Sequence, residues 1–410
     1  MTLQIFEAYG IELEYMLVDA STLDVRPMAD TVLGMLNGGQ ITGDVVRGPV
    51  TWSNELAMHV LELKVGTPNI RLATLAGQFE QAIIEIREVL ERCHLRLLPT
   101  AMHPWMDPRR DVVLWPHDCY EIYQGYDQIF GCRSHGWGNV QSVHLNVPFD
   151  GDEQFRRLHA AVRLVIPVLS ALTASSPIIG GQDTGIADNR MQQYCRHCDL
   201  MPALAGSVVP ETVRSEAEYE QMIFQPIREA ISKSKSASVM DPQFLNARGA
   251  IARFDRGSIE IRVMDVQEYP GADVAVCAAI IAVLRLLVDE KWSSLEEQEQ
   301  VATSRLRSVL DRVTVDAEMA VIDAPEYLRC FAVDAPSIRV SDLWNHLLEV
   351  ARREDSMVDN LFAPLEIILR DGTLSTRIRA AIDGDADPAN LQNVYEQVAD
   401  CLDRWEPFQP

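Results

Sequence analysis

The chain has 410 residues, a length that suits one large domain or two domains of ordinary size. It is 47% hydrophobic and 23% charged, a composition that excludes a disordered chain. The formal net charge of −24 argues against anionic partners, so we expect neither nucleic acid nor an anionic membrane surface to bind.

The N-terminus and the cysteines predict a cytoplasmic protein. No basic segment followed by an apolar run is present at the start, so we expect no signal peptide. The most apolar stretch, Val274 to Leu284, ends at Arg285 and is predicted to be too short to span a bilayer. The eight cysteines are expected to be reduced thiols. Cys195-Arg-His-Cys198 could be half of a zinc site, but a surface loop is the preferred interpretation because no second cysteine pair lies nearby.

In chain order, the hydrophobic pattern predicts strands and helices in mixed succession. Strands are expected over 4–18 and 56–65, a helix over 72–95, a strand over 95–102 and a loop over 103–108. A strand at 141–147 then precedes a helix over 153–173 and a polar loop over 174–189. Residues 205–245 are predicted to be irregular, and their Ser/Lys stretch at 232–236 suggests a mobile lid.

The last third of the chain is predicted to be helical. A strand at 258–265 leads into a helix that ends near residue 289, and amphipathic helices are expected over 341–353, 357–370 and 390–405. We therefore predict an α+β catalytic domain over residues 1–290, with residues 291–410 forming a helical region packed on it.

Four predicted strands combine an apolar face with a polar face. In Gly10–Asp19, the side chains of Glu12 and Glu14 point away from the apolar side. Two carboxylates about 7 Å apart on one strand repel each other, so a nearby divalent metal is a candidate, although a solvated strand face is the preferred interpretation of an isolated pair. The same alternation gives polar faces with Glu62 and Lys64, with Ser142, His144 and Asn146, and with Glu260, Arg262 and Met264. We therefore predict one sheet, with helices on one face and a cleft on the other.

The residue types in this cleft indicate metal-dependent phosphoryl transfer. Carboxylates with one imidazole suit Mg²⁺, and also Mn²⁺, better than a structural zinc. No P-loop and no G-x-S-x-G motif is present, and Gly136-Trp-Gly138 lacks the third glycine of a dinucleotide fingerprint. Hard cations held by carboxylates beside arginines are typical of phosphoryl transfer from a metal–nucleotide complex.

Five segments, in this order, resemble the ATP-dependent glutamate–cysteine ligases and related carboxylate–amine ligases of the glutamine synthetase-like superfamily. The segments are Gly10-Ile-Glu-Leu-Glu14, Glu62-Leu-Lys-Val-Gly-Thr-Pro68, Val143-His-Leu-Asn146, Ser176-Pro-Ile-Ile-Gly-Gly-Gln-Asp-Thr-Gly185 with Arg190, and Ser258-Ile-Glu-Ile-Arg-Val-Met-Asp265. The resemblance covers about residues 5–290. It implies an antiparallel sheet that forms a funnel, with acidic residues that hold Mg²⁺ against ATP. It also implies that the substrate carboxylate would be phosphorylated and that an amine would then attack the acyl phosphate to form an amide.

The resemblance also implies roles for individual residues. Glu12 and Glu260 would bind the ion that bridges the ATP phosphates, and Glu14, Glu55 and Glu62 the ion nearer the accepting carboxylate. His144 would ligate a metal or contact phosphate, and Asn146 and Arg253 would contact the nucleotide. Arg262, with Glu260, would act in catalysis by stabilising the transferring phosphoryl group, and Arg190 would bind carboxylate or phosphate. Glu55 requires a bulge or a separate segment, because it lies seven residues before Glu62. Ser142 stands where many relatives carry a second histidine.

These implications leave alternatives of different kinds. The preferred hypothesis is an active ligase that joins a small carboxylic acid, with glutamate as the first candidate, to cysteine or another amine. The alternatives are a relative that binds a nucleotide or metabolite without catalysis, and a guanidino kinase-like phosphotransferase. A homodimer is compatible with the sequence, which does not identify the amine.

Overall fold

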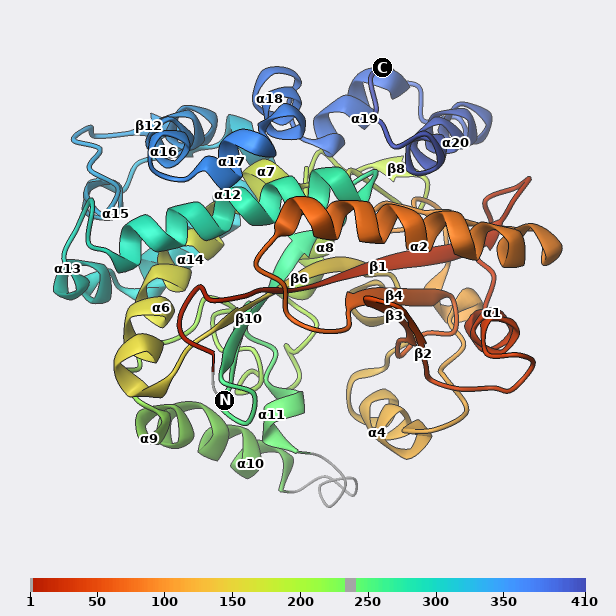
Figure 1. Cartoon of the computed structure of the whole chain (residues 1–410), viewed down its shortest axis with the longest axis horizontal. Coiled ribbons are helices and arrows are strands. Elements are labelled where there is room, and N and C mark those ends of the chain that lie inside the picture. The colour runs from red at the N-terminus through yellow and green to blue at the C-terminus, as the bar shows by residue number, and fades with distance from the viewer. Residues whose placement is uncertain (1–2, 233–240) are drawn as a thin grey trace.

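The computed structural model describes residues 3–232 and 241–410, and its centre is one antiparallel sheet (Figure 1). Adjacent strands in the main path are β2 (Asp44–Arg47), β3 (Val50–Asn54), β4 (Val60–Val65), β1 (Gly10–Asp19), β6 (Ser142–Pro148), β10 (Ser258–Asp265) and β9 (Ala250–Arg253). A further strand, β5 (Leu95–Leu98), pairs with the second half of β1. The predicted α+β class with an antiparallel sheet and outer helices is confirmed.

One face of the sheet forms the main hydrophobic core. Ile11, Leu13 and Tyr15 of β1 are fully buried there, as the alternation of the sequence predicts. Helices α2 (Leu72–Arg92) and α12 (Pro270–Val288) pack against each other over this face, and α6 (Gly151–Val165) packs on α12 (Figure 1). The apolar sides of these helices and of the strands therefore share one core.

Helix α12 is apolar on all sides because it is covered on all sides. The sheet lies on one side, and α16 (Val340–Glu354), α17 (Ser356–Asn360) and α18 (Phe362–Asp371) pack against the helix as a further layer (Figure 1). Among the described residues α12 is the one helix long and apolar enough to cross a membrane, yet 94% of its apolar segment is buried inside the protein. The sequence predicted a stretch too short to span a bilayer. That prediction of its length was wrong, because the helix has 19 residues.

The C-terminal helices reach the opposite face of the sheet. Met16 and Val18, which follow Glu12 and Glu14 on the same side of β1, are buried in a second core with α19 (Leu374–Ile382) and α20 (Pro388–Arg404). The polar part of this face is therefore confined to the first half of β1 and its neighbours.

The structure adds one hairpin to the predicted secondary structure and corrects one prediction. The hairpin of β2 and β3 turns at Gly48, with φ of +57°, and its short strands were not predicted. Residues 205–245 are not irregular throughout: α9 (Glu216–Tyr219), the π-helical turn η2 (Glu220–Phe224), α10 (Gln225–Ile231) and α11 (Pro242–Leu245) lie within them. Ile223, Ile227 and Ile231 recur every fourth residue and are buried, so the helical signal was present in the sequence. The Ser/Lys stretch of the predicted lid lies, from residue 233 onward, outside the described residues.

A β-bulge in β10 changes which side chains reach the cleft. Ile261 lies opposite Leu145, but Met264 lies opposite Val143, so β10 has one extra residue between these pairs. Met264 is consequently buried in the core, and the prediction that it faces the cleft was wrong. Asp265 takes its place on the polar side, opposite Ser142.

Candidate active site

The strand register brings the predicted acidic residues to one face of the sheet. Residues paired across an antiparallel ladder point to the same side. The relevant pairs are Glu12 with Lys64 and with His144, Glu14 with Glu62, and Glu260 with Asn146. Glu55 lies just beyond the end of β3, so the separate segment that its spacing from Glu62 required is present.

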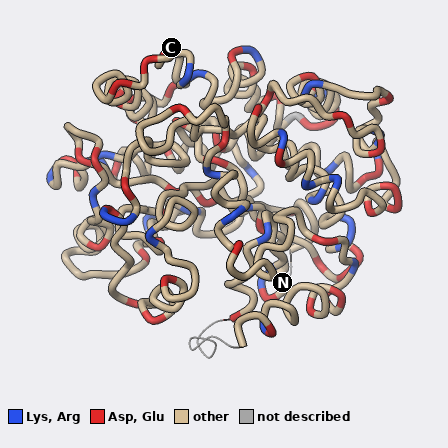
Figure 2. Tube along the Cα trace, turned by 180° about the vertical axis from the view of Figure 1, so that it is seen from behind, with Lys and Arg blue, Asp and Glu red and all other residues tan. Residues whose placement is uncertain are grey.

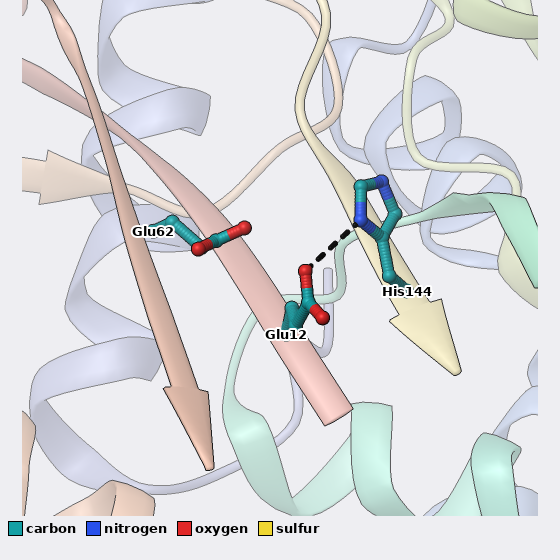
Figure 3. A group of neighbouring side chains, drawn as sticks. All are labelled: Glu12, Glu62 and His144. Carbon is teal, nitrogen blue, oxygen red and sulfur yellow. Dashed lines mark hydrogen bonds and ion pairs between the residues drawn. The ribbon is translucent and has the colours of Figure 1, made fainter. Parts of the chain in front are cut away.

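Glu12, Glu62 and His144 form the tightest acidic group (Figure 3). They come from β1, β4 and β6, and one ligand atom of each lies within 4.8 Å of the others. Glu12 Oε2 is 3.3 Å from His144 Nδ1, and Glu12 Oε1 accepts a hydrogen bond of 3.0 Å from Asn146 Nδ2. Glu14, Glu55 and Glu260 lie around this group and not within it.

Ser142 orders one side of the group. Glu14 Oε2 accepts hydrogen bonds from the backbone N–H of Ser142 at 2.6 Å and from its hydroxyl at 3.0 Å. The hydroxyl oxygen also lies 2.9 Å from His144 Nε2, so both nitrogens of the imidazole face acceptors. Burial opposes a charge on His144, but Glu12, Glu14 and Glu260 together raise its pKa. In this position, Ser142 connects a carboxylate to the imidazole.

Burial and crowding oppose ionisation of two of these carboxyl groups, and the adjacent cation offsets this only in part. Burial, with Glu12 and Glu55 nearby, raises the pKa of Glu62 well above its usual value, although Lys64 lies 2.8 Å away. Burial and the neighbouring Glu14 raise the pKa of Glu55 to about 7. For Glu12, contact with His144 outweighs burial and lowers the pKa to about 2. Crowded carboxylate oxygens with one imidazole fit a hard divalent cation such as Mg²⁺ or Mn²⁺.

Arginines surround Glu260 beside this group. Glu260 Oε1 accepts from Arg262 Nε at 3.1 Å and lies 2.9 Å from its Nη2, while Oε2 accepts from Arg253 Nη1 at 3.4 Å. Burial opposes the charge of Arg262, but Glu260 raises its pKa further. The sequence-predicted Arg253 and Arg262 are therefore both ion-paired with Glu260.

Arg190 is positioned by a residue to which the sequence analysis gave no role. Its Nη2 donates to the backbone oxygen of Arg262 at 2.9 Å, and its Nη1 lies 3.4 Å from Asp265 Oδ1. Asp265 is held in turn by Ser175 N–H and the Ser176 hydroxyl, each at 2.9 Å. Burial and Asp188 raise the pKa of Asp265 to about 8. Asp265 closes the motif that begins at Ser258, but only the bulge brings it to this side.

Two cavities meet at the acidic residues, and Glu55 lines both of them. The larger has a volume of about 590 Å³ and is lined by Gly10, Glu12, Glu62, Lys64, Asn146 and Arg256, among others. A Cβ atom at Gly10 would lie 3.2 Å from Asn146 Cβ, a tight contact that would require a small shift of Asn146. The smaller has a volume of about 250 Å³ and is lined by Glu14, Ser142, His144, Arg190, Arg262 and several aromatic residues.

Two other features do not join the acidic group. A cavity of about 620 Å³ lies among the C-terminal helices, where Arg305 and Glu326 already pair with each other at 2.6 Å. Residues 195–198 form a turn at which Arg196 is exposed, as the predicted surface loop requires, but Cys198 is buried; both cysteines have free thiols, whose pKa values burial raises to about 12. Charged residues are distributed around the whole chain trace, so the acidic sheet face is distinguished by burial and crowding (Figure 2).

The aromatic lining of the smaller cavity was missed by the sequence analysis. Tyr123 and Tyr126 come from α4 (Tyr120–Phe130), Trp137 from α5 (His135–Gly138), Tyr194 from α8 (Asn189–Tyr194) and Phe244 from α11. Tyr123 and Tyr126 are three residues apart, so the sequence could have predicted that both lie on one side of a helix. The tertiary structure alone brings the other rings next to them.

The chain has the glutamine synthetase-like fold, as its likeness to solved structures shows. A glutamate–cysteine ligase of Francisella tularensis, solved in complex with AMP, matches with a TM-score of 0.64 at 13% identity, over 98% of this chain and 90% of its own. A bifunctional glutathione synthetase of Pasteurella multocida matches with a TM-score of 0.65 at 13% identity, over 96% of this chain and 52% of its own. At this identity, the likeness concerns the fold.

The chain belongs to glutamate–cysteine ligase family 2, whose family model matches residues 8–397. An uncharacterized protein of Archaeoglobus fulgidus is 34% identical over 68% of this chain and 75% of its own length. A protein of Leifsonia xyli, provisionally named glutamate–cysteine ligase 2, is 25% identical over 96% of this chain and 95% of its own. The predicted family and the predicted enzyme class, a ligase that forms C–N bonds, are thereby confirmed.

Proposed function

We propose that this protein is an ATP-dependent carboxylate–amine ligase that works with Mg²⁺, with Mn²⁺ as a substitute. One observation carries the proposal: Glu12, Glu62 and His144 lie within 4.8 Å of one another on a buried sheet face, beside the Glu260–Arg262 ion pair and between two cavities. This arrangement suits a phosphoryl group that passes from a nucleotide in one cavity to an acceptor in the other.

Glu12, Glu62 and His144 would hold the metal, with Glu14, Glu55 and Glu260 as further ligands around them. A bound Mg²⁺ would offset the charge of the carboxylates and of the ATP phosphates. We assign ATP to the larger cavity, where Lys64, Asn146 and Arg256 offer hydrogen-bond donors. Arg253, paired with Glu260, would support the nucleotide side.

The acid substrate is assigned to the smaller cavity, near Arg190 and Arg262. A carboxylate oxygen of the acid attacks the γ-phosphorus of ATP, the bond to the β-phosphate oxygen breaks, and ADP leaves. The amine nitrogen then attacks the carbonyl carbon of the acyl phosphate, phosphate leaves with the C–O bonding pair, and the nitrogen loses a proton. Arg262, anchored on Glu260, stabilises negative charge on the phosphoryl oxygens during the first step.

Glutamate is the acid to test first, because relatives are named as glutamate–cysteine ligases. With Mg²⁺, ATP and glutamate, we expect an amine to elicit equal amounts of ADP, phosphate and amide. ADP with a phosphorylated guanidine and no phosphate would instead identify a guanidino kinase. Stabilisation by Mg²⁺–ATP without turnover across a panel of acids and amines would identify a binding protein without catalysis.

The unpaired cysteines are compatible with the cytoplasmic location that we propose.

A further inference from the structure

The smaller cavity has a wall of aromatic rings that the proposed phosphoryl transfer does not require. Its lining includes five aromatic side chains, from Tyr123, Tyr126, Trp137, Tyr194 and Phe244. These rings come from separate segments between residues 120 and 245, and they converge on a volume of about 250 Å³. A cavity of this kind takes an apolar body and orients it by a few polar groups.

The polar tips of these rings have partners within the protein itself, including the Tyr123 hydroxyl, which accepts from Asn54 Nδ2 at 3.4 Å. The Tyr126 hydroxyl donates to the Phe244 backbone oxygen at 3.2 Å, and the Tyr194 hydroxyl donates to the Arg248 backbone oxygen at 3.4 Å. Trp137 Nε1–H donates to the His197 backbone oxygen at 3.3 Å. With their polar atoms paired in this way, the rings present mainly apolar surface to a ligand.

The charged groups of the cavity are its acids and two arginines. Arg190 is only 2% exposed and already pairs with Asp265 through Nη1, so the group that remains for an anion of the acid substrate is its Nε–H, which has no partner among the described residues. Arg262 is already paired with Glu260. Arg190 is therefore the main anion-binding group of this cavity. Once it binds the acid substrate, little positive charge remains for a carboxylate of the amine substrate.

The remaining polar side chains near the rings are engaged or neutral. Asn246 donates from Nδ2 to the Tyr219 hydroxyl at 2.7 Å and accepts from Arg248 Nη1 at 3.1 Å. His197 contacts the Tyr194 backbone oxygen, and burial lowers its pKa to about 4. An amino-acid amine such as cysteine would bring a carboxylate that neither side chain can neutralise, whereas aromatic rings attract an ammonium group.

We propose that the amine substrate is a primary amine with an aromatic or branched aliphatic body and no carboxylate, bound by Tyr123, Tyr126, Trp137, Tyr194 and Phe244. This inference rests on the proposed ligase function and specifies its second substrate. The amine group faces Glu14 and Glu55, while the apolar body contacts the rings.

The first test compares amines in the complete reaction. With Mg²⁺, ATP and glutamate, 2-phenylethylamine and isopentylamine are expected to give amide with a kcat/KM about 10-fold or more above that of cysteine, a difference of about 1.4 kcal/mol. Cysteine equal to or better than both amines, in an enzyme that releases ADP, overturns the inference and leaves the ligase function standing. No Mg²⁺-dependent release of ADP with any acid and amine overturns the ligase function instead.

A binding measurement tests the cavity independently of turnover. Ligand-observed NMR, with Mg²⁺ and a non-hydrolysable ATP analogue present, is expected to show 2-phenylethylamine bound to the wild-type protein and about 10-fold weaker binding to Tyr126→Ala and Trp137→Ala. Tyr126→Phe is the matched control, because it keeps the ring and removes only the hydroxyl, so it is expected to rescue binding. Displacement of the amine by adenosine would assign the rings to the nucleotide base, and absence of amine binding would also overturn the inference.

Discussion

Single side chains in the site are fixed by ion pairs and hydrogen bonds, most of which join neighbouring strands. Glu260 on β10 is held by Arg253 from β9 and by Arg262 on its own strand. Glu12 on β1 contacts His144 and Asn146 on β6. Removal of one partner leaves the other buried with an uncompensated charge, so single substitutions here are expected to have large effects.

Arg262→Ala is expected to lower kcat by roughly 10²-fold or more and to change the KM for ATP much less. The guanidinium stabilises charge that moves between oxygens during transfer, and such a contribution is largest in the transition state. Steady-state kinetics with Mg²⁺–ATP and glutamate measure both constants, and Arg262→Lys serves as the variant that keeps a positive charge. An unchanged kcat with a raised KM would show that Arg262 only binds substrate.

Mg²⁺ is expected to bind more tightly as the pH rises from 6 to 8. Burial and Glu14 raise the pKa of Glu55 to about 7, so in the metal-free protein this carboxyl is largely protonated below pH 7 and must release its proton when a cation binds. Isothermal titration in two buffers with different ionisation enthalpies measures that release. Glu55→Gln should reduce both the proton release and the pH dependence; an affinity of the wild type that is constant across this range would contradict the assignment.

At the scale of elements, a buried ion pair between Arg377 and Glu268 joins the last helices to the sheet, and we call it the clasp. Arg377 of α19 donates to Glu268 Oε1 at 2.6 Å and to the Phe408 backbone oxygen at 2.7 Å. Glu268 lies three residues beyond β10, and both charged side chains are at most 2% exposed. The clasp therefore connects the end of β10, helix α19 and the C-terminal tail.

Arg377→Met is expected to destabilise the protein by about 3 kcal/mol, because it leaves Glu268 buried without its partner. The double variant Arg377→Met/Glu268→Met removes both charges and should recover a large part of this loss. Arg379→Met, on the same helix, is the control, because its partner Asp183 is partly exposed and the pair is expected to contribute at most about 1 kcal/mol. Urea denaturation measures all three; equal losses for Arg377→Met and Arg379→Met would contradict the clasp.

The whole molecule buries several histidines in neutral form. His103 donates from Nε2 to the Leu23 backbone oxygen at 2.7 Å and accepts at Nδ1 from Met106 N–H at 3.0 Å. Burial lowers the pKa of His59 and of His103 to about 4, and that of His159 to about 3. These groups link the stability of the packed layers to pH.

The free energy of unfolding is expected to fall as the pH decreases from 6.5 to 4. The folded pKa of His103 is lower than the unfolded value of 6.5, so the unfolded chain binds the proton more readily in this window. The stabilisation is fully present above pH 6.5, and about 2 kcal/mol of it is lost by pH 5 for this one residue. Urea denaturation at pH 7 and pH 5 should show a smaller difference for His103→Gln than for the wild type. The same difference in both proteins would exclude His103 from the effect.

The sequence by itself determined the chemistry of the sheet face. Strict alternation in Gly10–Asp19, Leu61–Val65, Gln141–Val147 and Ser258–Ile261 assigned Glu12, Glu14, Glu62, His144 and Glu260 to the side away from the core, since the side-chain period of a strand is two. It also determined the family, because the motifs occur in a specific order. The metal, nucleotide and catalytic roles that follow from these motifs remain proposals.

Only the tertiary structure decided how far this pattern extends and what surrounds it. The bulge in β10 places Asp265, and not Met264, on the polar face of the sheet. One extra residue reverses the alternation of side chains, so the pattern before the bulge does not continue after it. The apolar Met16 and Val18 continue the polar side of β1, and their burial under α19 and α20 depends on contacts with residues more than 350 positions away. The aromatic cavity depends in the same way on segments distant in sequence, because no local periodicity encodes which separate helices meet.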